Sequence, residues 1–418
     1  MEDSLPDPTD HQSSDRSRLW ASTMNGFTTA PGRYSGKTDE RLSSDGGVDA
    51  GIRLAHKDSS ATVTLTPLTF KPSNTHPVLG VRRRDREDIE AQFQSDSATK
   101  SVGAGRRARP EDPDEWRTCF EIDRDRILHS NSFRRLAGKT QVFVFPEDHQ
   151  RTRLTHALEV AQVATGISRA LGLNVALTEA VALGHDCGHG PGGHASEDAF
   201  EPYLDGGFDH APWGANVSLA TLNLCEETLD GIRNHSWSRP APLTPEGEVV
   251  SWADRIAYVC HDWEDAVIAR VVTQEMLPRL VRERCGDRRS HQLGAFIDAV
   301  VTTAIRTGRI GMDEDHAEAL SAFRSYNYEA IYLRKDSLDQ GNAVISVLRA
   351  LVEHYIENPQ RIAGYDQSRS NAELPRDLAS IVTDAVTYVA GMTDRFAFRQ
   401  AVSELGWDAD ALPVSAAG

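Results

Sequence analysis

The sequence has no apolar run long enough to cross a membrane and no targeting segment at its start. Nowhere in its 418 residues do about 18 apolar side chains follow one another, as a membrane-spanning helix requires. The opening MEDSLPDPTD lacks both the basic and the apolar part of a secretory signal. These absences predict a cytoplasmic protein without a membrane partner.

Cysteine is scarce, and the motifs of covalent catalysis are missing. The five cysteines are odd in number, scattered and free of CxxC spacing, which fits reduced thiols in a cytoplasm. No GxSxG elbow is present, and no cysteine has the local context of a nucleophile. A covalent intermediate on serine or cysteine is therefore not supported.

The common nucleotide-binding loops are also absent. The segment 137–140, AGKT, resembles the end of a P-loop, but Phe133 stands where the first glycine is required. The glycines between Gly188 and Gly193 follow an expected helix rather than a strand, so they do not form a dinucleotide fingerprint. A nucleotide would have to be bound in another way.

The balance of charge and hydropathy is unusual for a folded enzyme of this length. Hydrophobic residues make up 39% of the chain and the mean hydropathy is −0.45, which indicates that part of the chain is disordered. The net charge of −17 makes the surface as a whole repel nucleic acid and anionic membranes. An anionic substrate would therefore need a locally basic pocket.

Residues 1–110 are expected to form a disordered N-terminal extension. They are rich in Ser, Asp, Arg, Gly and Pro and show no sustained periodicity. The alternation at 62–66 could form a strand, but nothing nearby offers it a partner. Arginines at 82–84 and 106–109 leave contact with nucleic acid open, although a solvated tail is the more common role of such a patch.

Residues 111–418 predict one all-α domain with its core at about 151–272. Apolar residues recur at helical spacing over 156–171, which Gly172 ends, and over 252–268 and 343–355; Thr178 is the expected cap of the helix before His185. Only residues 140–145, TQVFVF, alternate as a strand would. Helix after helix predicts a helical bundle with additional C-terminal helices.

The densest group of metal-ligand side chains lies between Arg153 and Glu197. A single histidine on an apolar helix face is more often a hydrogen-bonded core residue than a ligand. Several imidazoles and carboxylates buried together would cost several kcal/mol per group without a partner. A divalent cation with N and O ligands removes that cost. The candidates are His156, His185, Asp186, His189, His194, Glu197 and, further along the chain, Asp254.

A second polar line runs along the expected helix that carries Asp254. Tyr258 and Asp262 follow at four and eight residues, so the three side chains share one face, as a pocket wall would require. Arg153 precedes His156 by three residues, and a planar guanidinium beside a metal suits a phosphate oxygen.

Together these motifs resemble the HD-domain metal phosphohydrolases, and within them the deoxyguanosine triphosphate triphosphohydrolase family. The resemblance rests on HSNSFRRLAGKTQVF, RTRLTHALEVAQVA, LTEAVALGHDCGHGPGGHASE, TLDGIRNHS and ADRIAYVCHD in this order. It implies an HD-domain helical fold that hydrolyses a deoxynucleoside triphosphate (dNTP) to deoxynucleoside and inorganic triphosphate. It also implies a divalent metal, Mn²⁺ or Mg²⁺ first, with Fe²⁺, Co²⁺ or Ni²⁺ tolerated, and a homo-oligomer; an allosteric nucleotide stays open.

The resemblance also implies a role for each matching residue. The metal ligands would be His156, His185, Asp186 and Asp254. The catalytic group would comprise His189, His194, Glu197 and His210. Substrate would be held by Arg153, Tyr258 and Asp262 and, more weakly, by Arg324 and Tyr332.

The chain departs from the family pattern at two places. Gly190 and Gly193 replace bulkier residues, which predicts a looser loop. The segment after His210 is altered, which leaves the position of this histidine and the catalytic efficiency open. Two alternatives remain: another HD-type nucleotide phosphohydrolase, or a catalytically weak scaffold that binds nucleotide or single-stranded DNA.

Overall fold

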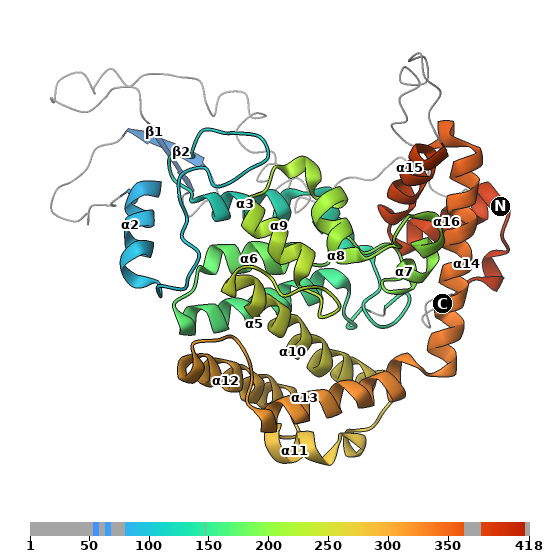
Figure 1. Ribbon diagram of the computed structural model, residues 1–418. Coiled ribbons are helices and arrows are strands. Elements are labelled where there is room, and N and C mark those ends of the chain that lie inside the picture. Colours follow the sequence, from blue (N-terminus) through green and yellow to red (C-terminus); the bar gives the residue numbers. More distant parts are fainter. Residues whose placement is uncertain (1–52, 58–62, 68–79, 147, 363–377, 414–418) are drawn as a thin grey trace, which may run out of the picture. The chain divides into compact units, whose positions relative to one another are not determined.

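The computed structural model describes residues 53–57, 63–67, 80–146, 148–362 and 378–413 (Figure 1). The chain divides into two compact units, Met1–Gly80 and Val81–Gly418. In the first unit, strand β1 (Arg53–Lys57) pairs antiparallel with β2 (Val63–Pro67). The strand expected near residues 62–66 therefore exists, and its partner is the preceding segment, whose alternation is too weak to stand out in the sequence.

The second unit is built from helices throughout its described residues, which confirms the all-α prediction. Its α-helices are α2 (Arg83–Phe93), α3 (Cys119–His129), α4 (Asn131–Arg135), α5 (Arg153–Leu171), α6 (Val175–Gly184), α7 (Ala195–Phe200), α8 (His210–Trp213), α9 (Glu226–Asn234), α10 (Pro245–Ile268), α11 (Arg279–Cys285), α12 (Arg289–Thr307), α13 (Glu314–Asn327), α14 (Lys335–Glu357), α15 (Leu378–Ala390) and α16 (Asp394–Leu405). Short 3₁₀ turns are η3 (Leu136–Gly138), η4 (Glu201–Tyr203), η6 (Ala220–Leu222), η7 (Gln274–Met276), η9 (Pro359–Arg361) and η11 (Ala409–Ala411). Two π-helical turns are η5 (Gly214–Ser218) and η8 (Tyr328–Tyr332).

Two hydrophobic cores organise this unit. The larger core joins α3, α5, α6, α9, α10, α12 and α13, with Ile167, Leu177 and Ile256 fully buried. The smaller core lies where α14 packs against α7, α15 and α16, around Phe200 and Tyr355. Figure 1 shows α5, α6 and α10 together and α14 to α16 grouped beside α7.

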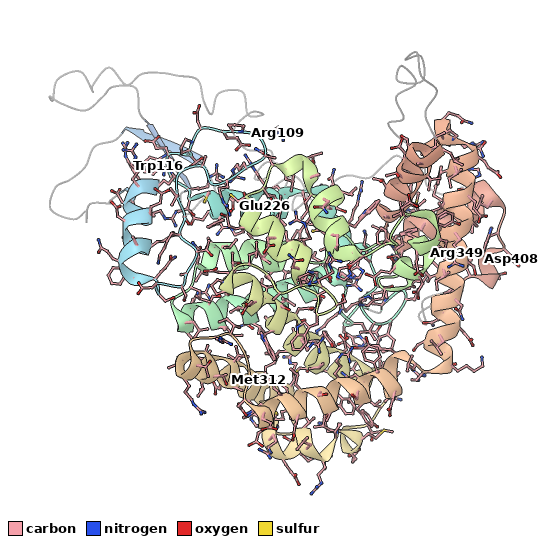
Figure 2. All side chains as sticks on the ribbon, in the orientation of Figure 1. Arg109, Trp116, Glu226, Met312, Arg349 and Asp408 are labelled. Carbon is pink, nitrogen blue, oxygen red and sulfur yellow. The ribbon has the colours of Figure 1, made fainter. Side chains whose placement is uncertain are left out.

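Polar contacts join α7 to the C-terminal helices as well. Arg349, labelled in Figure 2, reaches from α14 to donate a hydrogen bond of 2.8 Å to the carbonyl of Asp198 on α7. Helix α7 carries Glu197. The smaller core therefore holds one of the candidate site residues in place.

The folded unit begins at Val81, so the predicted start at residue 111 is wrong. Thr99 donates two hydrogen bonds to the buried Glu246, and the buried Arg107 pairs with Asp123 at 2.5 Å. This segment buries few apolar side chains and is held by polar contacts, which hydropathy does not reveal. Arg107 is thus held inside the protein, whereas its neighbour Arg106 is exposed and pairs with Glu227 at the surface.

The strand expected at residues 140–145 is not formed. Thr140 makes only an isolated bridge to Thr152. Val142 and Phe143 pack against the larger core, whereas Val144 and Phe145 pack against the smaller one, so the side chains separate in pairs rather than alternating between two faces. Phe145 has a left-handed backbone with φ of 54°, which ends any extended run.

The helix ends follow local capping chemistry. Gly172 ends α5 with φ of 66°, as predicted. Helix α6 is capped by Asn174, whose side chain accepts from the backbone amide of Leu177 at 3.2 Å. Thr178 lies inside the helix and donates to the carbonyl of Asn174, so its predicted capping role is wrong.

Candidate active site

The four predicted metal ligands come together from three helices. His156 lies in the first turn of α5, His185 and Asp186 follow the end of α6, and Asp254 lies within α10. His156 Nε2 is 3.0 Å from Asp254 Oδ1. His185 Nε2 is 3.5 Å from Asp186 Oδ1 and 3.8 Å from Asp254 Oδ1. Ligand atoms of one cation with bonds of about 2.1 Å stand about 3 Å apart or slightly more, so the cluster has suitable dimensions.

The orientation of His185 fits a metal ligand. Its Nδ1–H donates to the carbonyl of Ala182 at 2.6 Å, so that the other ring nitrogen, Nε2, faces the two carboxylates. That buried Nε2 has no hydrogen-bond partner. Burial raises the pKa of Asp254, but His156 and His185 outweigh it and hold the pKa below its usual range. An acceptor nitrogen and anionic oxygens that face one another suit a divalent cation.

Arg153 lies next to the ligand cluster, as its spacing from His156 predicts. Its Nη1 donates to Asp186 Oδ2 at 2.8 Å, and its side chain is buried. Although burial raises the pKa of Asp186, Arg153 and the neighbouring histidines keep that pKa well below its usual range. The Nε of Arg153 is buried without a hydrogen-bond partner.

The loop between Gly190 and Gly193 is tight, so the prediction of a looser loop is wrong. A Cβ at Gly193 would lie 2.6 Å from Arg153 Nη2 and 2.9 Å from the carbonyl oxygen of Thr140, and its φ is +62°. A Cβ at Gly190 would lie 2.6 Å from Ser196 Cβ. Glycine here allows the loop to approach the arginine closely.

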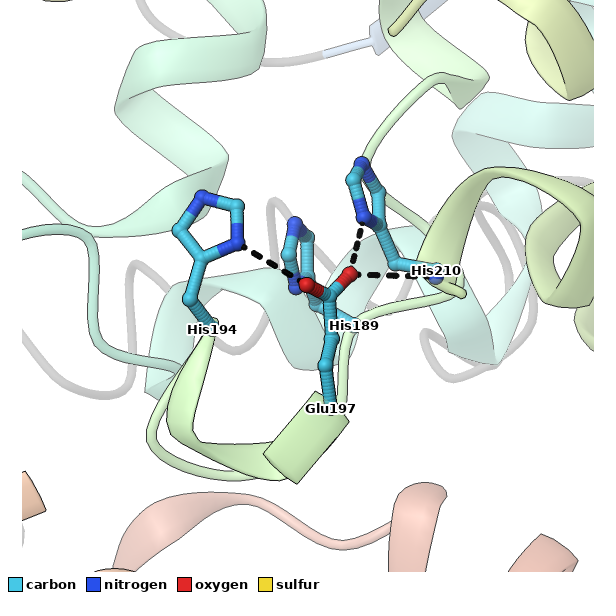
Figure 3. Close-up of side chains that lie close together, drawn as sticks. All are labelled: His189, His194, Glu197 and His210. Carbon is cyan, nitrogen blue, oxygen red and sulfur yellow. Dashed lines mark hydrogen bonds and ion pairs between the residues drawn. The ribbon is translucent and has the colours of Figure 1, made fainter. Parts of the chain in front are cut away.

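The predicted catalytic residues form a second cluster around Glu197 (Figure 3). Glu197 Oε1 lies 2.5 Å from His210 Nδ1, and Glu197 Oε2 lies 3.3 Å from His194 Nδ1. His189 stacks on His210 with ring centroids 3.7 Å apart. Asp209 caps α8, and the backbone amide of His210 also donates to Glu197 Oε1 at 3.2 Å, which places His210 within this cluster.

The charges in this cluster are set by the surrounding groups. Burial raises the pKa of Glu197, but the hydrogen bonds with His194 and His210 outweigh it, so this carboxylate stays ionised. Burial lowers the pKa of His210, and the Glu197 carboxylate more than compensates, so the net shift is upward. Burial, Arg153 and His210 together push the pKa of His189 well below its usual range. His194 is exposed.

His235 belongs to the site although the sequence analysis assigned it no role. It follows α9 and donates its Nδ1–H to the carbonyl of Ile232 at 2.8 Å. Its Nε2 lies 3.2 Å from His210 Nε2, and its ring centroid lies 4.9 Å from that of His185. Burial, followed by the two histidines, lowers its pKa to about 3. The available signal was its position: like His185, it is the residue that directly follows the last turn of a helix, and its Nδ1 bonds to the carbonyl three residues earlier.

The predicted substrate contacts lie together along α10, α13 and η8. Arg324 donates to the Tyr258 hydroxyl at 3.1 Å, and the Tyr332 hydroxyl donates to Asp262 Oδ2 at 2.5 Å. Asp262 Oδ1 is buried without a partner, and burial raises the pKa of Asp262 to about 7. Tyr258 and Asp262 lie on the same face of α10 as Asp254, as their spacing predicts.

Comparisons with known families agree with this arrangement. A family model described as HD domain matches residues 153–259, and one described as phosphohydrolase-associated domain matches residues 310–402. The first match contains all four residues of the ligand cluster. Fold and site thus define an HD-domain phosphohydrolase.

Relatives specify the family further. A "deoxyguanosinetriphosphate triphosphohydrolase-like protein" from Caldanaerobacter subterraneus is 38% identical over 330 residues, which cover 75% of this chain and 93% of the relative. A protein of the same name from Clostridium perfringens strain 13 is 42% identical over 325 residues, covering 74% of this chain and 92% of the relative. This chain belongs to the deoxyguanosinetriphosphate triphosphohydrolase-like family.

None of the helices in the described part of the chain is both long and apolar enough to span a bilayer.

Proposed function

We propose that this protein hydrolyses a dNTP to deoxynucleoside and inorganic triphosphate, and that it depends on a divalent cation. The observation that carries the proposal is the ligand cluster of His156, His185, Asp186 and Asp254 next to the Glu197–His210 pair. The printed names of the relatives support this substrate class. The proposal names dNTPs in general and no particular base. The base is selected by the shape of the pocket, and a sequence motif does not record that shape.

The ligand cluster would hold the cation, with Mn²⁺ or Mg²⁺ favoured and Fe²⁺, Co²⁺ or Ni²⁺ tolerated. The cation supplies Lewis-acid charge toward a phosphate group. Arg153 supplies further positive charge next to it, and a phosphate oxygen would give its buried Nε the partner that it lacks.

The residues around Glu197 would move the protons. Water attacks the α-phosphorus and loses a proton to the His–carboxylate group of His194, Glu197 and His210. The bond from phosphorus to the 5′ oxygen breaks, that oxygen takes up a proton, and triphosphate leaves intact. Such a general acid or base contributes about 10²–10⁴-fold in rate. Tyr258 and Asp262 would face the sugar, with Arg324 and Tyr332 holding them in place.

Incubation with each of the four dNTPs and with Mn²⁺ or Mg²⁺ tests the proposal, with products separated by ion chromatography. We expect inorganic triphosphate from at least one dNTP and none after the cation is chelated. Asp186→Ala should abolish the release, whereas His316→Gln, a surface histidine paired with Asp313, should retain it.

Each alternative has its own result. Pyrophosphate or single phosphate as the product would identify another HD-type phosphohydrolase. Binding of nucleotide or single-stranded DNA without turnover would identify a scaffold. Wild-type activity in a folded Asp186→Ala variant would refute the assigned ligand cluster.

A further inference from the structure

Cys119 and Cys225 lie against each other inside the protein, although they are far apart in the sequence. Both side chains are buried, and both are free thiols. A Cβ placed on Gly105 would lie 3.3 Å from the Cys119 sulfur and 2.4 Å from the Cys225 sulfur, so the sulfurs can be no farther apart than the sum of these distances. The Cys225 thiol donates a hydrogen bond to the Cys119 sulfur. The two sulfurs are therefore in contact.

The backbone around this thiol pair is held by polar contacts. Cys119 is the first residue of α3, and Cys225 directly precedes α9. The carboxylate of Asp123, on α3, accepts from the backbone amide of Cys225 at 2.8 Å and from the hydroxyl of Thr228, on α9, at 2.7 Å (Figure 1). A bond between the sulfurs would thus join two helix starts that Asp123 already links.

The surroundings of Cys119 favour its thiolate. The hydrogen bond from Cys225 outweighs burial and lowers the pKa of Cys119 below its usual range. The start of a helix favours negative charge, and Arg107 adds positive charge, because its Nη2 donates to the carbonyl of Cys119 at 2.9 Å. The thiolate is the nucleophilic form of cysteine, so Cys119 should be the sulfur that reacts first.

The other three cysteines are in apolar surroundings. Burial raises the pKa of Cys187 to about 12 and that of Cys285 to about 11. Burial also raises the pKa of Cys260 well above its usual range. Neutral, buried thiols are inert toward oxidants, so these three serve as internal controls.

A cavity gives small molecules access to Cys119. Its volume is about 390 Å³, and its lining includes the exposed Asp112 and Arg117, so it opens to solvent. Cys119 lines this cavity and Cys225 does not. A peroxide entering from solvent would therefore meet Cys119 first.

We propose that Cys119 and Cys225 are a redox-sensitive pair, which a peroxide converts into an intramolecular disulfide between the starts of α3 and α9. The Cys119 thiolate attacks a peroxide oxygen, the O–O bond breaks, and a sulfenic acid forms on Cys119. The hydroxide that leaves takes up the proton of the Cys119 thiol and becomes water.

The second step closes the disulfide. The Cys225 sulfur attacks the Cys119 sulfur, the S–O bond breaks, and the departing hydroxide takes up the proton of the Cys225 thiol. Two thiols and one hydrogen peroxide thus give one disulfide and two water molecules. The sulfurs lose the two electrons that the peroxide gains, and a thiol reductant reverses the change.

Thiol mapping after peroxide treatment tests the inference. The reduced full-length protein is treated with hydrogen peroxide, its remaining thiols are blocked with iodoacetamide, and the non-reduced digest is analysed by mass spectrometry. We expect two of the five thiols to be lost first, as a linked peptide pair containing Cys119 and Cys225, and dithiothreitol to restore both. Cys225→Ser should instead accumulate a sulfenic acid on Cys119 that dimedone traps. The control Cys285→Ser should form the linked pair as the unaltered protein does.

Five free thiols after treatment of the unaltered protein would overturn the inference, and so would oxidation of Cys119 while Cys225 stays free. A disulfide between two chains would also overturn it, as would earlier oxidation of Cys187, Cys260 or Cys285. These results do not depend on whether any variant folds. The measurement contains no nucleotide, so it is independent of the proposed function. A disulfide without triphosphate release would leave the thiol pair standing and remove the function, and triphosphate release with five free thiols would do the reverse.

Discussion

The carboxylate of Asp394 accepts hydrogen bonds from both the backbone amide and the hydroxyl of Thr140, at 2.8 and 2.6 Å. Its other oxygen accepts from the amide of Gly192 at 2.8 Å. One side chain at the start of α16 therefore holds two loops that flank the site. Lys139 adds to this link, because its buried ammonium donates to the carbonyls of His189 and Ala390.

We expect Asp394→Ala to reduce both stability and activity. Three donors, two of them buried, lose their acceptor, and losing hydrogen bonds to a charged group costs about 2–3 kcal/mol or more. Chemical denaturation measures this loss, and kcat measures the displacement of the loop. Asp336→Asn, at an exposed ion pair, should change the free energy of unfolding by less than about 1 kcal/mol. Equal stability of the two variants would show that Asp394 does not hold the loops.

Gly193→Ala should impair activity strongly, although the substitution adds only one methyl group. The new methyl group would meet the backbone carbonyl of Thr140 and displace Arg153 from Asp186, in a left-handed conformation that costs alanine about 1–2 kcal/mol. A steady-state assay should show a raised KM if Arg153 holds phosphate. The control is Gly166→Ala within α5, where nothing lies within 4 Å, and it should stabilise the helix by about 1 kcal/mol. Unchanged kinetics in Gly193→Ala would exclude the close approach as a requirement.

Glu197→Gln tests the His–carboxylate group. The amide can still accept from His210, but the negative charge is lost, so the pKa of His210 should fall and kcat should drop about 10²–10⁴-fold. The bound-metal content should not change, since His156, His185, Asp186 and Asp254 are all retained. Glu201→Gln, an exposed neighbour, is the matched control. A decrease of less than about tenfold would remove Glu197 from the proton-transfer group.

Asp262 should make the protein less stable as pH rises. Its folded-state pKa of about 7 lies above the unfolded value of about 3.9, so between these values the folded protein binds more protons. The free energy of unfolding therefore falls from about pH 4 to about pH 7 and levels off above, by at most about 4 kcal/mol. Asp262→Asn should remove this slope and raise the melting temperature at pH 8 more than at pH 5. Exposed Asp298→Asn should leave the slope unchanged. An unaltered slope in Asp262→Asn would assign it to other groups.

Helices were predictable because their signals are local. The apolar spacing from His156 to Leu171 and the stop at Gly172 act within a few residues, so periodicity and caps reveal them. The motif around His185 and Asp186 was equally visible, because adjacent residues carry the chemistry. The strand prediction for residues 140–145 was wrong because the apolar side chains of this segment pack into two different cores. A local alternation of apolar residues does not reveal that division.

The sequence by itself determined the helical class, the family and the residue types of the ligand cluster, since each depends on neighbours along the chain. Only the tertiary structure decided that His235 meets His210, that Arg153 pairs with Asp186 and that Asp394 holds Thr140. These contacts join residues far apart in the chain. Their existence depends on how helices pack and on which buried polar group needs a partner, and that requirement appears only after the chain has folded.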